Sequence, residues 1–180
     1  MYEANFKRFF DILLSLIAII LFLPILLILY FLVKFDTSGP FIFKQERVGK
    51  MLQKFVIYKI RTMSEEASKD ANDESKKYVT TSLNDKRVTK IGNILRKFHL
   101  DELPQFWNVL KGDMSIIGIR PDHISQKADY DKDFWIERHS IKPGITGLSQ
   151  IKSDKFLSNK NARNKYCLLY TSPSPRDKTV

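Results

Sequence analysis

The chain has 180 residues and a mass of 21.1 kDa, which suits one ordinary domain with an appendage and excludes a multidomain machine. Hydrophobic residues make up 43% of it, enough for a packed core, so a wholly disordered chain is also excluded. The formal net charge of +10 favours an anionic partner such as nucleic acid, a phosphorylated metabolite or an acidic membrane surface. With one cysteine, Cys167, and 3 scattered histidines, the composition predicts neither a disulfide nor a structural zinc site.

A long apolar segment lies near the N-terminus. Residues 12–33 carry no charged side chain, and a membrane-spanning helix needs about 20 such residues. No small-residue cleavage site follows, so the segment is predicted to be retained. Pro24, near its middle, removes a backbone donor and predicts a kink. Two interpretations stay open: a kinked spanning helix, and a re-entrant helix that enters one leaflet, breaks at Pro24 and returns. Basic residues at both ends (Lys7, Arg8 and Lys34) favour the re-entrant helix.

Strand and helix patterns follow the apolar segment. The runs FIFKQERVGK and FVIYKIRTM are β-branched and aromatic, and they predict two strands that could pair as a hairpin. Residues 64–78 have no hydrophobic face and are predicted to be an exposed loop with at most a helical turn. Apolar residues at helical spacing from Val88 to Phe98 predict an amphipathic helix with Asp85 as its N-cap. Its basic face is either solvated or rests on acidic lipid headgroups.

The segment LDELPQFWNVLKGD predicts a short helix that starts at about Asp101 and has Gly112 just past its end. Pro104 fits this helix only within its first turn. Asp101 and Glu102 would then lie at the positive end of the helix dipole, where carboxylates are stabilised and phosphate is attracted. Taken alone, the pair is better explained as an N-cap and a favourable first-turn Glu.

Two rigid turns follow this helix. Residues 114–117 predict a strand that leads into a turn presenting Arg120, whose guanidinium could bind a diphosphate through its bidentate fork. Residues 142–150 predict a second turn that enters a strand. Residues 131–133 read Asp-Lys-Asp, which is interpreted as solvated surface because such short matches arise readily in charged helices.

These motifs together resemble the bacterial sugar transferases, monotopic phosphoglycosyl transferases that start polyprenyl-linked glycan assembly. The resemblance rests on the ordered segments FKRFFDILLSL, YKIRTM, LRKFHLDELPQFWNVLKGDMSIIGIRP and KPGITGLSQI. It implies an α/β (α+β) domain with an N-terminal re-entrant membrane helix over residues 1–36, broken at Pro24. Residues 37–166 would form the cytosolic catalytic domain, with amphipathic helices at the membrane surface and a few short strands. Where the family continues with a further helix, residues 167–180 are predicted to be a non-native or disordered tail.

The resemblance also implies a catalytic dyad of Asp101 and Glu102 that depends on Mg2+ and binds it. The implied reaction moves a sugar-1-phosphate from a UDP-sugar to polyprenyl (undecaprenyl) phosphate and releases UMP. This is the first membrane step of lipopolysaccharide, capsule or exopolysaccharide assembly. Asp101 is expected to attack the β-phosphorus and form a covalent intermediate, and Glu102 to orient or deprotonate the acceptor. Four basic residues are predicted to bind substrate: Lys59, Arg61, Arg96 and Arg120.

The expected location is the bacterial inner membrane, with the globular part on the cytoplasmic face, no nucleic-acid partner and a possible homodimer. Three departures from the family pattern bear on sugar choice and helix geometry: Leu23 replaces the Ser before Pro24, Ile119 replaces the Pro before Arg120, and residues 148–149 are Leu-Ser. Two rival hypotheses stay open. One is a non-enzymatic, membrane-tethered basic module that binds acidic lipid or nucleic acid. The other is direct transfer in a ternary complex without a covalent step.

Overall fold

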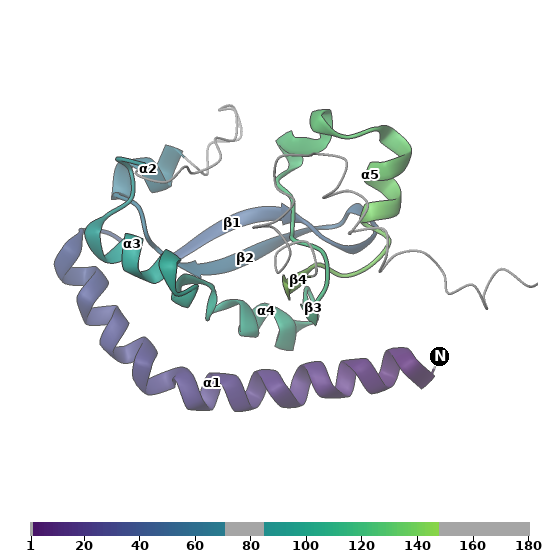
Figure 1. Cartoon of the computed structure of the whole chain (residues 1–180), viewed down its shortest axis with the longest axis horizontal. Helices are drawn as coiled ribbons and strands as arrows, with labels where there is room; N and C mark the ends of the chain where they lie inside the picture. Colours follow the sequence, from purple (N-terminus) through teal and green to yellow (C-terminus); the bar gives the residue numbers. More distant parts are fainter. Residues whose placement is uncertain (1, 71–84, 148–180) are drawn as a thin grey trace, which may run out of the picture.

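The longest element is α1 (Tyr2–Asp36) in the computed structural model, which describes residues 2–70 and 85–147. Pro24 lies inside α1 without interrupting it, and the helix bends near its middle (Figure 1). The predicted break at Pro24 is therefore corrected to a bend within one continuous helix. A proline removes one i→i−4 hydrogen bond and tilts the turn before it, while the bonds on either side keep the two halves helical.

A narrow stripe of α1 packs against the rest of the domain. Asp11, Ser15, Leu29 and Val33 are buried along it, and Leu26 is partly buried between them. Neighbouring members of this set are separated by three or four residues, or by whole multiples of a helical turn, so they lie on one face of the helix. Most other large apolar side chains of α1 are exposed, from Phe6 to Phe35. Judged by length and composition alone, α1 could cross a membrane.

Strands β1 (Ile42–Val48) and β2 (Lys54–Ile60) form an antiparallel hairpin, which confirms the predicted pair of strands. Ile42 lies opposite Ile60 and Val48 opposite Lys54. A short 3-10 turn, η1 (Lys50–Leu52), joins the strands. Met51 and Leu52 there have φ values of 55° and 63°, in the left-handed region that non-glycine residues seldom adopt.

Two helices follow the hairpin, α2 (Glu65–Asp70) and α3 (Lys90–Lys97). Part of the segment predicted as an exposed loop is therefore helical, and residues 71–78 lie outside the described part of the chain. The predicted N-cap of α3 is wrong: Thr89, not Asp85, accepts a hydrogen bond from the Gly92 backbone N–H, at 2.9 Å. Asp85 lies four residues before Thr89, too early to cap the helix, and instead pairs with Arg87, whose Nη2 lies 2.6 Å from Asp85 Oδ2.

The rest of the described chain contains short elements. They are η2 (Leu100–Glu102), α4 (Gln105–Lys111), β3 (Ser115–Ile117), η3 (Ile124–Asp129), α5 (Lys132–Arg138) and β4 (Gly144–Thr146). Strands β3 and β4 pair in parallel, at the two places where the sequence predicts strands. Gly112 caps α4 with a φ of 92°, as predicted for the residue just past that helix.

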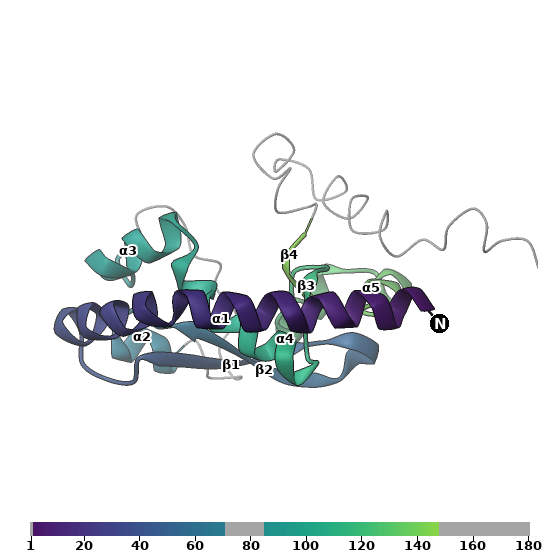
Figure 2. The same cartoon turned by 90° about the horizontal axis from the view of Figure 1, so that it is seen from below.

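Helix α4 lies between α1 and the β1–β2 hairpin, as Figure 1 shows, and it contacts both. One buried cluster joins Leu29 and Val33 of α1 to Ile60 and Leu95. A second joins Ile57, Val109 and Met114. Figure 2 shows α1 lying along one side of the domain. Helix α1 is thus part of the folded unit, not an appendage joined to it by a linker.

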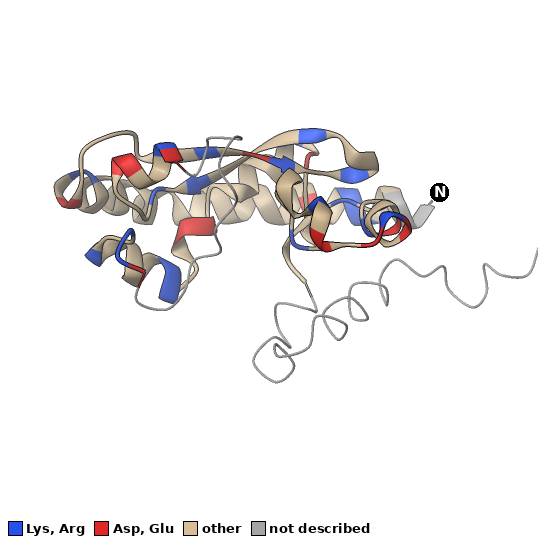
Figure 3. Cartoon of the chain, turned by 90° about the horizontal axis from the view of Figure 1, so that it is seen from above, with Lys and Arg blue, Asp and Glu red and all other residues tan. Residues whose placement is uncertain are grey.

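Charge is distributed unevenly over this arrangement. Figure 3 shows α1 free of charge between its two ends, whereas Lys, Arg, Asp and Glu are scattered over the hairpin, α3 and α5. Asp131, Lys132 and Asp133 are all exposed, which confirms that this acidic pair is solvated surface.

Candidate functional site

Asp101 and Glu102 lie in the short turn η2, which connects α3 to α4. The predicted helix start at Asp101 is wrong by four residues, because α4 begins at Gln105 with Pro104 as its N-cap. A tight 3-10 turn precedes the helix instead. His99 enters this turn with a φ of 54°, a conformation that His adopts more readily than most residues. This left-handed residue separates the end of α3 from η2, and the two carboxylates lie directly after it.

Two basic side chains converge on Glu102. Lys59 Nζ, from β2, lies 2.9 Å from Glu102 Oε1, and Arg120 Nη2, from the turn after β3, lies 3.7 Å from the same oxygen. The side chains of Lys59 and Glu102 are 20% and 12% exposed, whereas that of Arg120 is 55% exposed and so remains reachable by a ligand. We call Asp101, Glu102, Lys59 and Arg120 the Glu102 cluster. The structure therefore brings together both carboxylates of the predicted dyad and two of the four predicted substrate-binding cations.

The two adjacent carboxyl groups are shifted in opposite directions. Asp101 is 8% exposed, and burial raises its pKa above the usual 3.8, with repulsion from Glu102 adding to the effect and Lys59 and Arg96 opposing it. Burial also acts to raise the pKa of Glu102, but the charges of Lys59 and Arg120 outweigh it and hold this pKa below 4.5. The two carboxyl groups thus differ in their surroundings: burial disfavours the charge of Asp101, whereas Glu102 takes the direct ion pairs.

Arg96 and Arg61 take different positions from the two cations of the cluster. Arg96 Nε donates to Thr62 Oγ1 at 2.8 Å, and its charge is close enough to lower the pKa of Asp101. Arg61 is 2% exposed and donates to the backbone carbonyls of Thr37 and Ser38, just after α1. Arg61 therefore braces the connection between α1 and β1, and these contacts do not support the prediction that it binds substrate.

A buried ionic group supports the turn that carries Arg120, and sequence patterns did not predict it. The Arg138 guanidinium forms a salt bridge with Asp122 and donates from Nη2 to the Arg120 carbonyl at 3.1 Å. Asp122 and Arg138 are each 5% exposed, and His139 Nε2 lies 3.5 Å from Asp122 Oδ2. Because Asp122 and Arg138 are 16 residues apart and on different elements, no local spacing could reveal their pairing.

Asn108 is a second residue that the sequence did not single out. It is fully buried, accepts from the Tyr58 backbone N–H at 3.0 Å and donates to the Val56 carbonyl at 2.7 Å. These bonds fix α4 against β2, and therefore fix the distance between Glu102, just before α4, and Lys59, on β2. A polar residue on the inward face of an amphipathic helix is the sequence signal that could have found it.

The fit of the site to Mg2+ can be judged from its donors. Within residues 2–70 and 85–147 no group of three or more His, Cys, Asp or Glu side chains could hold a metal ion. Mg2+ commonly takes one or two protein carboxylates and completes its shell with water and substrate phosphates. Adjacent Asp101 and Glu102 meet that smaller requirement, so the donor set fits a metal ion that binds together with a phosphorylated substrate.

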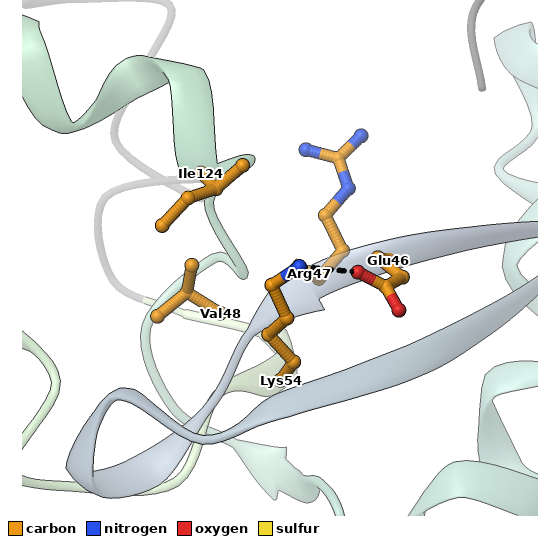
Figure 4. A pocket seen from close by; sticks show the side chains of 5 residues that line it. All are labelled: Glu46, Arg47, Val48, Lys54 and Ile124. Carbon is orange, nitrogen blue, oxygen red and sulfur yellow. Dashed lines mark hydrogen bonds and ion pairs between the residues drawn. The ribbon is translucent and has the colours of Figure 1, made fainter. Parts of the chain in front are cut away.

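Two surface hollows lie apart from the Glu102 cluster. Figure 4 shows the first, a depression over the hairpin lined by Glu46, Arg47, Val48, Lys54 and Ile124, where Lys54 Nζ pairs with Glu46 Oε2 at 2.9 Å. The second lies at the far end of α4. Neither hollow is lined by a residue of the Glu102 cluster.

Comparison with known proteins gives a consistent set of matches. A family model described as bacterial sugar transferase matches residues 2–173. The chain is 43% identical over 150 residues to UDP-N-acetylgalactosamine-undecaprenyl-phosphate N-acetylgalactosaminephosphotransferase of Aeromonas hydrophila, covering 82% of the chain and 34% of that protein. It is 41% identical over 171 residues to UDP-glucose:undecaprenyl-phosphate glucose-1-phosphate transferase of Klebsiella pneumoniae, covering 92% and 36%.

A shorter relative is covered more fully. The chain is 42% identical over 151 residues to the exopolysaccharide production protein PSS of Rhizobium leguminosarum bv. phaseoli, covering 81% of the chain and 73% of that protein. By contrast, the matches span only about a third of the Aeromonas and Klebsiella relatives.

Proposed function

Because the chain belongs to the bacterial sugar transferase family, we propose that it transfers a sugar-1-phosphate from a UDP-sugar to polyprenyl phosphate and releases UMP. The observation that carries the proposal is the adjacent pair Asp101 and Glu102, held beside Lys59 and Arg120 in a domain that also contains an apolar helix. Relatives whose names specify undecaprenyl phosphate and a UDP-sugar support this substrate pair. The name of the Rhizobium relative specifies exopolysaccharide production.

Asp101 is the nucleophile in this proposal. One of its carboxylate oxygens forms a bond to the β-phosphorus of the UDP-sugar, the bond from that phosphorus to the bridging oxygen breaks, and UMP leaves with the bridging oxygen. An oxygen of polyprenyl phosphate then attacks the same phosphorus. The bond to Asp101 breaks, which regenerates the carboxylate and yields a polyprenyl diphosphate sugar.

The raised pKa of Asp101 suits this role. A carboxylate that burial destabilises is a stronger nucleophile than one stabilised by two ion pairs, and Asp101 is the member of the dyad without a direct ion pair among the described residues. Glu102, whose lowered pKa keeps it ionised, can orient the acceptor phosphate or take its proton.

Lys59 and Arg120 provide positive charge where phosphoryl oxygens gather negative charge in the transition state. Both cationic groups already lie within 4 Å of Glu102 Oε1, at 2.9 Å for Lys59 and 3.7 Å for Arg120. Little rearrangement of these side chains is therefore needed for them to contact an incoming diphosphate. Arg120 is the more exposed of the two and offers the bidentate fork that suits a phosphate. Arg96, whose Nε donates to Thr62 Oγ1, acts on Asp101 through its charge.

We propose Mg2+ as the cofactor, held by Asp101 and Glu102 together with substrate phosphate oxygens. When bound, Mg2+ supplies charge neutralisation at the diphosphate. The protein's own contribution is to keep two carboxylates adjacent on one tight turn, with Glu102 fixed by Lys59.

We further propose that α1 lies in the inner membrane and that the domain faces the cytoplasm. Large apolar side chains are exposed on α1 and also on the two helices that contact it: Ile94 on α3 and Trp107 on α4, with Phe98 just after α3. Such surfaces favour contact with the apolar edge of a bilayer. The lipid-linked acceptor would then reach the site without leaving the membrane. Self-association as a homodimer stays a prediction.

The test is UMP release by the membrane-embedded chain, given Mg2+, polyprenyl phosphate and a panel of UDP-sugars. We expect release with the preferred donor from the wild type and from Asp129→Asn, an exposed control carboxylate, but not from Asp101→Asn. Retained turnover in Asp101→Asn would remove Asp101 as the nucleophile. Donor labelled in the sugar separates a covalent from a direct path, because only the covalent path leaves label on the protein when the acceptor is withheld.

A further inference from the structure

A cavity of about 300 Å3 lies at the end of α4 opposite the Glu102 cluster, next to the turn between β1 and β2. Its charged lining residues are Lys50, Lys54, Lys142 and Asp113. At 1.5 Å per residue, the length of α4 alone separates the cavity from Glu102 by about 10 Å. The cavity is therefore a separate feature that the proposed reaction does not use.

Two of the four charges in the lining are already neutralised. Lys54 pairs with Glu46 at 2.9 Å, and Asp113 pairs with Lys111 at 3.1 Å. Within residues 2–70 and 85–147, the side chains of Lys50 and Lys142 form neither a hydrogen bond nor an ion pair. The cavity thus carries two lysines whose charge has no direct partner.

Arg8 of α1 adds a third positive charge beside them. A side-chain carbon placed on Gly112 would lie 3.6 Å from Arg8 Nη2 and 3.8 Å from Lys142 Nζ, so both cations converge on that glycine. Arg8 is held there by the carbonyls of Val109 and Leu110, at 2.6 and 2.8 Å. These acceptors carry no formal charge and leave the charge of Arg8 in place.

The convergence of these cations affects the charge of Lys142. Burial lowers the pKa of Lys142, and the positive charges of Arg8 and Lys50 lower it further, against the opposing effect of Asp11 and Asp113. Like charges gathered at a cavity repel one another unless an anion lies between them. An anionic ligand would relieve this repulsion.

We propose that this cavity binds a phosphate group through Lys50 and Lys142, with Arg8 at its edge. Lysine ammonium groups bind phosphate as compact point charges with several donors. The cavity lies beside Arg8 near the start of α1, where the neighbouring Phe6, Phe9 and Phe10 are 68%, 59% and 40% exposed. Aromatic residues next to a cation are typical of the headgroup layer of a bilayer, so an anionic lipid headgroup can supply the phosphate there, as can phosphate from solution.

The test compares two double variants of the full chain in nanodiscs of phosphatidylcholine and phosphatidylglycerol. Lys50→Gln/Lys142→Gln removes the two unpaired charges, and Lys127→Gln/Lys132→Gln removes two exposed charges from η3 and α5. Mass spectrometry measures the phosphatidylglycerol retained by each protein. A 31P NMR titration with inorganic phosphate measures binding from solution.

In the cavity variant, Lys50→Gln/Lys142→Gln, we expect the enrichment of phosphatidylglycerol around the protein to fall by about fivefold for each lysine removed. The control variant should keep the wild-type enrichment. Loss of inorganic phosphate binding in the cavity variant alone, with lipid retention unchanged, would also support the site and assign it to soluble phosphate. Equal losses in both variants, or no loss in either assay, would overturn the proposal. Lys50→Gln alone, at an exposed position in the turn, repeats the test if the double variant does not fold. Because no readout is catalytic, the outcome does not depend on the proposed reaction.

Discussion

Asp101 and Glu102 are neighbours in sequence, yet their side chains meet different surroundings. Asp101 points into the protein, where desolvation penalises its charge, while Glu102 shares one oxygen with Lys59 and Arg120. Two carboxyl groups whose pKa values are shifted in opposite directions by their surroundings are candidates for different tasks in a site. In the proposed reaction the two residues would therefore take different tasks because their environments differ, although both carry a carboxyl group.

Asp101→Asn should lower the rate of UMP release by at least about a thousandfold. It should also raise the thermal unfolding temperature. The folded state raises the pKa of Asp101, so the protonated group favours folding, and this stabilisation is lost as pH rises through the folded pKa. Above that pKa the charged group destabilises the fold, and a neutral amide removes the penalty. Thermal unfolding at pH 7.5 measures the shift. A lower unfolding temperature for Asp101→Asn would show that the carboxylate is stabilising.

The pH dependence of the rate should follow Asp101. In the proposed reaction its ionised form is the nucleophile, so kcat/KM should rise with pH in a window above 3.8. Lys59→Met removes a charge that lowers both pKa values and should move the rise to higher pH. The exposed Lys44→Met on β1 serves as the control. A pH profile that is identical in the two variants would exclude this electrostatic role for Lys59.

At the scale of elements, the turn that carries Arg120 depends on α5. Arg138 spans the turn by binding both the Arg120 carbonyl and the Asp122 carboxylate, with the Nη2 to Asp122 Oδ1 distance at 3.3 Å. Arg138→Lys keeps the charge beside Asp122 but cannot reach both partners. We expect kcat/KM to fall by about tenfold, the typical size of the loss when a supporting partner is removed.

The readout that identifies Arg138 as a positioning residue is its coupling to Arg120. If Arg138 acts through Arg120, the loss from Arg138→Lys should largely disappear in an Arg120→Ala background, because the group that it positions is then absent. Losses that add fully across the cycle would indicate a purely structural role.

Helix α3 approaches the end of β2 at a glycine. A side-chain carbon on Gly92 would lie 2.0 Å from the Thr62 carbonyl oxygen, a backbone atom that cannot move alone. Gly92→Ala should therefore destabilise the fold by about 1–3 kcal/mol, the usual cost of overpacking, even though alanine favours helices. Urea unfolding measures the change in the free energy of unfolding, and Asn93→Ala, at the exposed next position, is the matched control. Equal stability of Gly92→Ala and wild type would contradict the close contact.

These elements also show which parts of the fold the sequence could predict. The hairpin and the Gly112 cap follow from local patterns of one strand or one helix end, and both are found. The helical period of this segment, with Pro104 allowed only in the first turn, predicts a helix start at about Asp101, whereas the chain first makes a 3-10 turn. The Asp122 and Arg138 pair depends on how η3 and α5 return to the sheet, which no pattern of local spacing encodes.

At the scale of the whole molecule, both ends of α1 are attached to the same folded body. Near the start, Lys7 donates to the Ile117 carbonyl at 3.0 Å, and the Asp11 carboxylate accepts from Ser115 Oγ at 2.8 Å. Near the end, Asp36 accepts from the Ile91 backbone N–H at 3.2 Å, and Val33 is 2% exposed in the core. A helix of this length would extend about 52 Å if straight, well beyond the roughly 30 Å of a bilayer core. A body bound at both ends of α1 would itself have to cross the membrane if α1 did.

We therefore expect α1 to enter and leave the bilayer on one side, with both ends on the side of the domain. In a Cys167→Ser background, single cysteines at the exposed Asn5, Phe35 and Lys132 report the two ends of α1 and the domain. A membrane-impermeant maleimide should label all three cysteines on sealed inverted vesicles, which expose the cytoplasmic face. It should label none of them on sealed right-side-out vesicles. Labelling of Asn5→Cys and Phe35→Cys from opposite faces would establish a spanning helix. It would also require the contacts of Lys7 and Asp11 to be broken in the membrane, because they hold the first turns of α1 to β3.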